Sequence, residues 1–74
     1  MTKSDPYSAA KSKLGVRISQ LREQKGISQR QLALRLELDR VTLNKIESGT
    51  GNPTFETLLR IAGGLDVEVQ DLLG

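Results

Sequence analysis

The chain has 74 residues, a net charge of +2 and neither cysteine nor histidine. A chain this short forms one small domain, near the lower limit that a single hydrophobic core can stabilise. Without cysteine there are no disulfides or thiolate metal sites, and without histidine the commonest general base and metal ligand are missing. The phosphate-loop patterns GxxxxGK[ST] and GxGxxG are also absent. We therefore expect no catalytic residue, no metal and no cofactor, and predict that the chain is not an enzyme.

The sequence contains no signal for a membrane or for export. No run of about 18 apolar residues occurs, and the N-terminal stretch MTKSDPYSAAKSK lacks the apolar core of a secretory signal. We expect a cytoplasmic protein without a membrane span.

The charges are distributed unevenly along the chain. Residues 1–45 hold ten Lys and Arg against four Asp and Glu, a net charge of +6, whereas residues 46–74 hold one Arg against five acids, a net charge of −4. Such an asymmetry is typical of a molecule that turns one side toward a polyanion such as nucleic acid. Ordinary scattered surface charge is the alternative that this pattern leaves open.

The first predicted helix begins at or after Pro6 and ends near Lys25. Asp5 is a candidate N-cap with Pro6 at the first helical position, and Gly26 is a candidate stop signal. Gly15 should weaken the helix slightly. Apolar residues recur at intervals of three and four, as on one face of an amphipathic helix. They are Tyr7, Ala10, Leu14, Ile18 and Leu21.

Two short helices follow, separated by a break at residues 37–38. Ser28 can cap the second helix and Asp39 the third. Two helices joined so closely must cross steeply, and the small side chain of Ala33 lets them approach each other. The residues expected on their inner faces are Leu32, Ala33, Leu36, Leu43 and Ile46.

A turn-rich loop, residues 48–53, leads to a fourth helix that Thr54 can cap and that Gly63-Gly64 should end. A fifth helical segment lies within residues 67–73. No strand pattern occurs, so we predict an all-α fold of five helices. The residues expected to be buried, at least in part, are Phe55, Leu58, Leu59, Ile61, Ala62, Val69, Leu72 and Leu73.

The outer face of the third helix is unusual. In LDRVTLNKIE, an apolar residue stands beside two cations and an amide on the side opposite Leu43 and Ile46. A helix about 10–12 Å across fits the major groove of B-DNA, which is about 12 Å wide. Ordinary solvated charge is the alternative. The outward residues are Arg40, Val41, Asn44 and Lys45.

The stretch from Leu14 to Leu73 resembles the helix-turn-helix domain of the Cro and lambda-repressor type, which bacterial repressors and restriction–modification controller proteins share. The specific parts are LREQKGISQRQLA, IESG followed by a loop with proline, and LLRIAGGLDV. The resemblance implies a lambda-repressor-like DNA-binding domain at residues 14–74. Residues 1–13 would form an N-terminal arm and the start of the first helix.

The resemblance also implies a role for each outward residue. Arg40 or Lys45 would donate to guanine, Asn44 would pair with adenine, and Val41 would pack against a thymine methyl. Gln29 matches a glutamine that contacts a phosphate and braces the recognition helix. The expected phosphate contacts, which set register rather than sequence, are Gln29, Thr42, Ser48, Thr50 and Asn52.

Two structural features follow from the same resemblance. Arg22 and Glu47 match an ion pair between the first helix and the end of the third. Glu37 stands where the family often has a glycine with positive φ, so we expect the turn to form at a cost of about 1 kcal/mol relative to glycine.

The function implied is a transcription regulator that binds double-stranded DNA, a (pseudo)palindromic operator, as a homodimer and needs no small-molecule effector. A restriction–modification controller is the leading form. The alternative is a protein-interaction module such as an antitoxin. The sequence does not identify the operator, the regulated gene, the direction of regulation or the host. The predicted dimer interface consists of Val67, Val69, Leu72 and Leu73.

Overall fold

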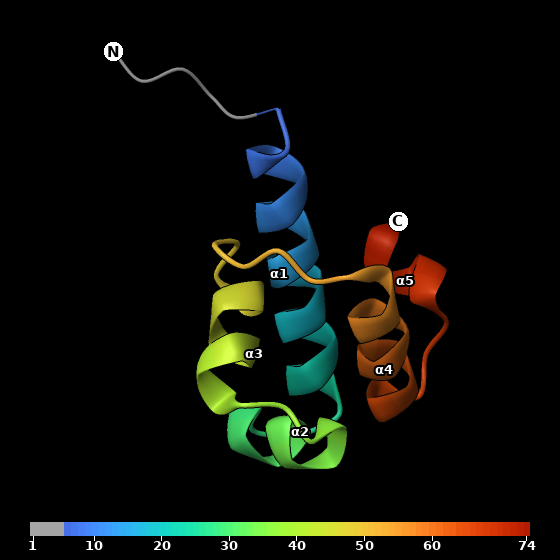
Figure 1. The fold of residues 1–74 in the computed structure, drawn as a ribbon. Coiled ribbons are helices and arrows are strands. Elements are labelled where there is room, and N and C mark those ends of the chain that lie inside the picture. The colour runs from blue at the N-terminus through green and yellow to red at the C-terminus, as the bar shows by residue number, and fades with distance from the viewer. Residues whose placement is uncertain (1–5) are drawn as a thin grey trace.

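The computed structural model describes residues 6–74, which form five helices and no strand, so the predicted all-α fold is confirmed. In Figure 1, α1 is the long upright helix, with α3 on one side, α4 and α5 on the other, and α2 at its lower end. None of the helices described is long and apolar enough to cross a membrane. The helices are α1 Ser8–Gln24, α2 Gln29–Leu36, α3 Arg40–Glu47, α4 Phe55–Leu65 and α5 Val69–Leu73.

All five helices contribute to one core. The largest fully buried side chains come from all five helices, two of them from α4 and one from each of the others. A chain of this length can bury so much apolar surface only if each short helix supplies one or two such residues. These side chains are Ile18, Leu32, Leu43, Ile61, Leu65 and Leu72.

α1 begins two residues after the candidate start at Pro6. Pro6 is not helical, α1 starts at Ser8, and Tyr7 is the N-cap without a side-chain capping hydrogen bond. Asp5 lies outside the described residues. The first turns project past the other helices (Figure 1), and Tyr7 and Ala10 are exposed there, so no core packing supports a further turn. The predicted stop is confirmed, since Gly26 has φ +68°.

The N-caps of α2 and α4 are confirmed, but that of α3 differs. The backbone N–H of Gln31 donates to Ser28 Oγ at 3.0 Å, and that of Thr57 donates to Thr54 Oγ1 at 3.1 Å. Asp39 occupies the N-cap position of α3, yet its side chain makes no capping hydrogen bond. The prediction that the Asp39 side chain caps α3 is therefore wrong.

The turn between α2 and α3 has the predicted left-handed residue. Glu37 has φ 55° and ψ 39°, and the next N–H, that of Leu38, donates to the carbonyl of Ala33 at 2.9 Å. Arg60 of α4 donates to the free carbonyl of Leu36 at the end of α2. The turn thus forms with a glutamate because these backbone and side-chain hydrogen bonds define its geometry.

α4 continues through the two glycines that were expected to end it. It extends to Leu65, which is 1% exposed, and Asp66 provides the left-handed C-cap. A Cβ on Gly64 would lie 2.7 Å from Cδ2 of Leu36, so the second glycine allows α4 to pack closely on α2. Packing of the last turn outweighs the low helix propensity of glycine.

α1 approaches the end of α3 very closely at Gly15. A Cβ at this position would lie 2.3 Å from the carbonyl oxygen of Glu47 and 2.6 Å from that of Ile46. Such distances are far below van der Waals contact with a backbone that has little freedom to move. Gly15 therefore does more than weaken α1, because it sets the distance between α1 and α3.

We expect Gly15→Ala to lower the free energy of unfolding by about 1–3 kcal/mol, because the added methyl group must push α3 away from α1. Gly63→Ala is the matched control, since it also changes a glycine inside a helix but has nothing within 4 Å of the new Cβ. This control should gain about 0.5–1 kcal/mol from helix propensity. Urea unfolding of both variants measures the difference, and stabilisation by both would disprove the packing role of Gly15.

Candidate nucleic-acid interface

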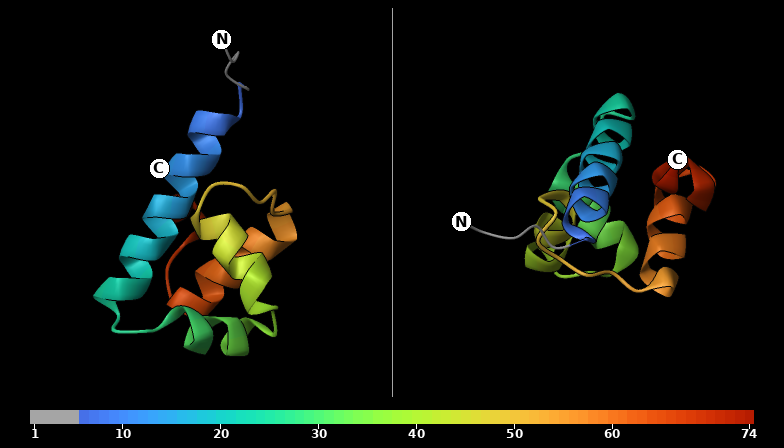
Figure 2. Two further views of the ribbon diagram at one scale, coloured as in Figure 1. Left: turned by 90° about the vertical axis from the view of Figure 1, so that its left-hand side faces the viewer. Right: turned by 90° about the horizontal axis from the view of Figure 1, so that it is seen from above.

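α3 has one buried face and one exposed face. Leu43 and Ile46 are 0% and 3% exposed and hold the helix against the core, whereas Val41 on the opposite side is 58% exposed. The two faces follow from the spacing of three and four residues along the helix. α3 lies nearest the viewer when the molecule is seen from the side (Figure 2, left). All four predicted base-contacting residues are exposed on it: Arg40, Val41, Asn44 and Lys45.

The exposed face of α3 borders a shallow depression against the start of α2. The depression is lined by Gln29, Arg40, Val41 and Asn44. It therefore presents a guanidinium group, two amides and an apolar side chain side by side. These are the groups that can donate to guanine, pair with adenine and contact a thymine methyl, respectively.

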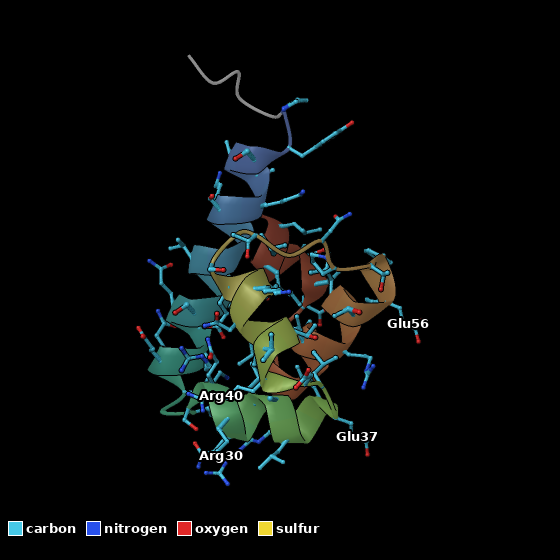
Figure 3. All side chains as sticks on the ribbon, turned by 60° about the vertical axis from the view of Figure 1, so that its left-hand side comes forward. Arg30, Glu37, Arg40 and Glu56 are labelled. Carbon is cyan, nitrogen blue, oxygen red and sulfur yellow. The ribbon has the colours of Figure 1, made fainter. Side chains whose placement is uncertain are left out.

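Charged side chains of opposite sign lie toward different edges in one view of the molecule. Figure 3 shows Arg30 of α2 and Arg40 of α3 toward one edge, whereas Glu37 and Glu56 lie toward the other. Arg30 is exposed, and the sequence analysis assigned it no role. Its position one residue after Gln29 in the first turn of α2 was the signal that could have identified it as a possible phosphate contact.

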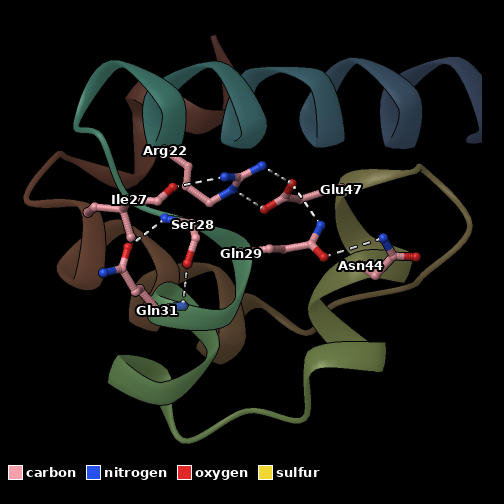
Figure 4. A network of polar contacts seen from close by, with 7 residues as sticks. All are labelled: Arg22, Ile27, Ser28, Gln29, Gln31, Asn44 and Glu47. Carbon is pink, nitrogen blue, oxygen red and sulfur yellow. Dashed lines mark hydrogen bonds and ion pairs between the residues drawn. The ribbon is translucent and has the colours of Figure 1, made fainter.

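A bidentate ion pair connects α1 with the end of α3. Arg22 Nε donates to Glu47 Oε2 at 2.9 Å, and Arg22 Nη2 donates to Glu47 Oε1 at 3.1 Å. The third guanidinium nitrogen, Nη1, donates to the carbonyl of Ile27 at 2.8 Å. The two charged side chains are only 13% and 6% exposed. The pair implied by the resemblance is thus present, largely buried, and tied to the segment before α2 (Figure 4).

Gln29 extends this network to the exposed face. Its Nε2 donates to Glu47 Oε1 at 3.1 Å, and its Oε1 accepts a longer hydrogen bond of 3.5 Å from Asn44 Nδ2 (Figure 4). A carboxylate can only accept, so Glu47 holds the NH₂ group of Gln29 toward itself and the oxygen toward Asn44. The buried ion pair thereby orients an amide on the surface of α3.

The loop after α3 folds back on the carbonyl of Lys45. The backbone N–H groups of Thr50 and Gly51 each donate to the carbonyl of Lys45 at 2.9 Å, and Ser48 Oγ donates to it at 3.1 Å. Ser48 Oγ also lies 3.1 Å from Thr50 Oγ1. The two predicted phosphate-contacting hydroxyls are therefore engaged in closing the loop, although a hydroxyl oxygen keeps further hydrogen-bonding capacity.

The structure brings other predicted phosphate contacts together. Thr42 and Asn52 are exposed, and both line a second shallow depression with Lys45 and Thr54. Gln29 lies across α3 from them, in the first depression. The predicted polar residues thus flank α3 on two sides, as two strands of a groove would require.

The predicted interface residues of the C-terminal segment differ in exposure. Leu72 is 2% exposed and belongs to the core of its own chain, so little of its side chain is left to face a partner. Val67 and Val69 are partly buried against this core, whereas Leu73 is 55% exposed.

The exposed apolar residues of α4 were missed. Phe55 and Leu59 are 60% and 48% exposed, although both were expected to be at least partly buried. They stand four residues apart on one side of α4, while Leu58 and Ile61 take the inner side. The apolar residues of α4 cover more than half of its circumference, and this was the signal that some of them must be exposed.

Comparison with known proteins identifies the family. The helix-turn-helix family (HTH_3) matches residues 18–72, which include all of α2, α3 and α4. The chain belongs to the Cro/lambda-repressor-type helix-turn-helix family. The proteins of this family that it matches are DNA-binding transcription regulators and not enzymes.

The similarity extends to individual proteins. The immunity repressor protein of Bacillus phage phi105 is 36% identical over 61 residues, which are 82% of this chain and 42% of the repressor. The chain thus spans less than half the length of that curated relative. Among solved structures, the restriction-modification controller protein C.AhdI from Aeromonas hydrophila has a TM-score of 0.84 and 38% identity, covering 86% of this chain and 97% of C.AhdI.

A second structure contains nucleic acid. The biofilm regulator SinR, solved in complex with DNA, has a TM-score of 0.78 and 35% identity, and the match covers 82% of this chain and 98% of that one. The helix-turn-helix of this chain is therefore a member of a DNA-binding family in fold as well as in sequence.

We expect Glu47→Gln to lower the free energy of unfolding by about 3 kcal/mol, because it leaves the Arg22 guanidinium largely buried without a charged partner. Glu23→Gln is the control: it removes the same charge from an exposed site on α1 and should change stability by less than about 0.5 kcal/mol. Urea unfolding measures both. Equal small effects would show that the pair does not stabilise the helix-turn-helix.

Proposed function

We propose that this helix-turn-helix protein is a sequence-specific transcription regulator that binds a (pseudo)palindromic operator as a homodimer. One observation supports this function above the others. α3 exposes cations, an amide and a valine, while a buried ion pair anchors the C-terminal end of the helix. A surface helix of a small protein gains nothing in stability from such a face. It does gain recognition, because each of these groups complements a feature of a base-pair edge.

In this proposal, α3 lies in the major groove. Arg40 or Lys45 donates to guanine O6 and N7, Asn44 pairs with adenine, and Val41 contacts a thymine methyl. Backbone phosphates on the two sides of the groove would be contacted from the two depressions that flank α3. The phosphate-contacting residues proposed are Gln29, Arg30, Thr42, Ser48, Thr50 and Asn52.

Regulation would follow from occupancy of the operator in the cytoplasm. Two half-sites about 34 Å apart, one turn of DNA, would each receive one α3 of the dimer. Whether bound protein blocks or recruits polymerase depends on where the operator lies relative to the promoter. Occupancy would respond to protein concentration through the dimer equilibrium, without a small-molecule effector.

The structure suggests a dimer surface different from the one predicted. Leu59 and Phe55 of α4 and Leu73 of α5 are each about half exposed or more, on two helices packed together at one side of the molecule (Figure 1). Burying them against a second copy would add apolar surface to a domain that has little to spare. Val67 and Val69 would lie at the margin of this surface, and Leu72 beneath it.

A restriction–modification controller is the form that we favour. The match with the controller C.AhdI covers 86% of this chain and 97% of C.AhdI, so it includes nearly all of that controller. The alternative is a protein-interaction module, such as an antitoxin, whose exposed apolar side chains on α4 and α5 cover a different protein.

We expect Arg40→Ala to weaken binding to the selected operator by about 1–3 kcal/mol and to relax the preference at one base pair. Arg35→Ala is the control, because it also removes an exposed arginine but at the end of α2 that faces α4. The measurement is gel shift on duplexes selected from a random library. Equal weakening by Arg40→Ala on every sequence would make Arg40 a backbone contact, and no selected operator would refute the regulator.

We expect Leu59→Asp to convert the dimer to monomer, because a charge would have to be buried at the interface. Leu34→Asp is the control: Leu34 is 70% exposed on α2, outside the proposed surface, so the same change should leave the dimer intact. Sedimentation velocity distinguishes the two species. A dimer that persists in Leu59→Asp would exclude this side of α4 from the interface.

A further inference from the structure

Asp39 occupies the N-cap position of α3, but its side chain makes no capping hydrogen bond. Its backbone is extended, with φ −64° and ψ 135°, much like those of Ser28 and Thr54 at the starts of α2 and α4. Both of those side chains accept a backbone N–H of the helix that follows. The carboxylate of Asp39 accepts no such hydrogen bond and is exposed.

The carboxylate also has no ion pair, although a cation is next to it in sequence. Arg40 follows Asp39 directly, and among the described residues the structure records one ion pair, that of Arg22 with Glu47. Asp39 thus places an unneutralised negative charge at the tip of the helix that we assign to the major groove. Next to a polyanion such a charge costs binding free energy unless it has a partner on the DNA.

The major groove offers few partners to a carboxylate. Guanine presents two acceptors there and thymine one, and each repels a carboxylate oxygen. Adenine presents the donor N6 beside the acceptor N7, so only one carboxylate oxygen is accommodated. Cytosine presents the donor N4 with no acceptor of its own in the major groove, which makes it the best match for Asp39.

We propose that Asp39 is a specificity-determining residue whose carboxylate accepts a hydrogen bond from the amino group of a base, cytosine in preference to adenine, beside the base that Arg40 reads. This inference rests on the proposed placement of α3 in the major groove. Asp39 also acts by exclusion: it disfavours guanine and thymine at its position and lowers the affinity for DNA in general.

Asp39→Asn tests this directly. Asparagine is as good an N-cap as aspartate and has the same shape, so the variant removes the charge without removing a cap. Glu37→Gln is the matched control, because it removes one negative charge two residues earlier, away from the edge that carries Arg40 (Figure 3). A randomised duplex library is selected with each full chain, and the recovered sites are remeasured by competition gel shift.

We expect Asp39→Asn to lose about tenfold of its discrimination for cytosine at one position of each half-site. It should also bind non-selected DNA about threefold more tightly. Glu37→Gln should keep the selected sequence of the unmodified chain, and the melting temperature of Asp39→Asn should be unchanged.

Two results would overturn the inference. If Asp39→Asn selects the same sequence as the unmodified chain while Arg40→Ala does not, α3 reads DNA but Asp39 does not. If Asp39→Asn lowers the melting temperature without changing selection, the carboxylate acts on the stability of α3 alone. If the unmodified chain itself selects no preferred sequence, the proposed function as a sequence-specific regulator is refuted.

Discussion

The buried pair of Arg22 and Glu47 is the interaction on which the rest of this structure depends. Its two hydrogen bonds join α1 to the last residue of α3, and the remaining nitrogen of Arg22 holds the carbonyl of Ile27 just before α2. One guanidinium thus fixes three segments of the helix-turn-helix. Such a pair is costly to desolvate and contributes little net stability, but its directional hydrogen bonds define a geometry. Here the geometry is the orientation of α3.

The pair works because the backbones around it approach so closely. Gly15 lets the carbonyls at the end of α3 lie against α1, and at this separation Arg22 reaches Glu47 with both Nε and Nη2. α3 itself buries only two large side chains, too few to fix its rotation about its own axis by packing alone. Directional hydrogen bonds supply the constraint that the small apolar contact lacks. The outer face of α3 can therefore be polar without loss of order.

The sequence predicted the parts of the fold that depend on local chemistry. The caps at Ser28 and Thr54, the stop at Gly26 and the inner faces of α2 and α3 follow from residue type and helical spacing. It failed where tertiary packing overrides propensity. Helix-breaking glycine is a weak signal once the last turn of α4, including Leu65, is buried, and this is why α4 passes through Gly64.

The sequence predicted some features of the candidate site and missed others. The exposure of Arg40 and its neighbours on α3 follows from the helical spacing of the apolar residues alone. That spacing does not reveal that Ser48 and Thr50 donate hydrogen bonds to the carbonyl of Lys45. Likewise, an apolar stripe cannot show which of Leu72 and Leu73 enters the core, since both satisfy the same pattern. Those choices depend on how α5 docks on α4, which is a tertiary property.

The division of charge along the chain acquires a physical meaning in this arrangement. The basic segment 1–45 supplies α1, α2 and most of α3, whereas the acidic segment 46–74 supplies the end of α3, α4 and α5. A protein that met DNA with α4 and α5 would be repelled by it, so its own field disfavours approach with those helices first. The same acids leave α4 and α5 free to carry exposed apolar residues without attracting nucleic acid to them. Charge thus separates the surface proposed for DNA from the surface proposed for a second copy, within a domain too small to separate them by distance.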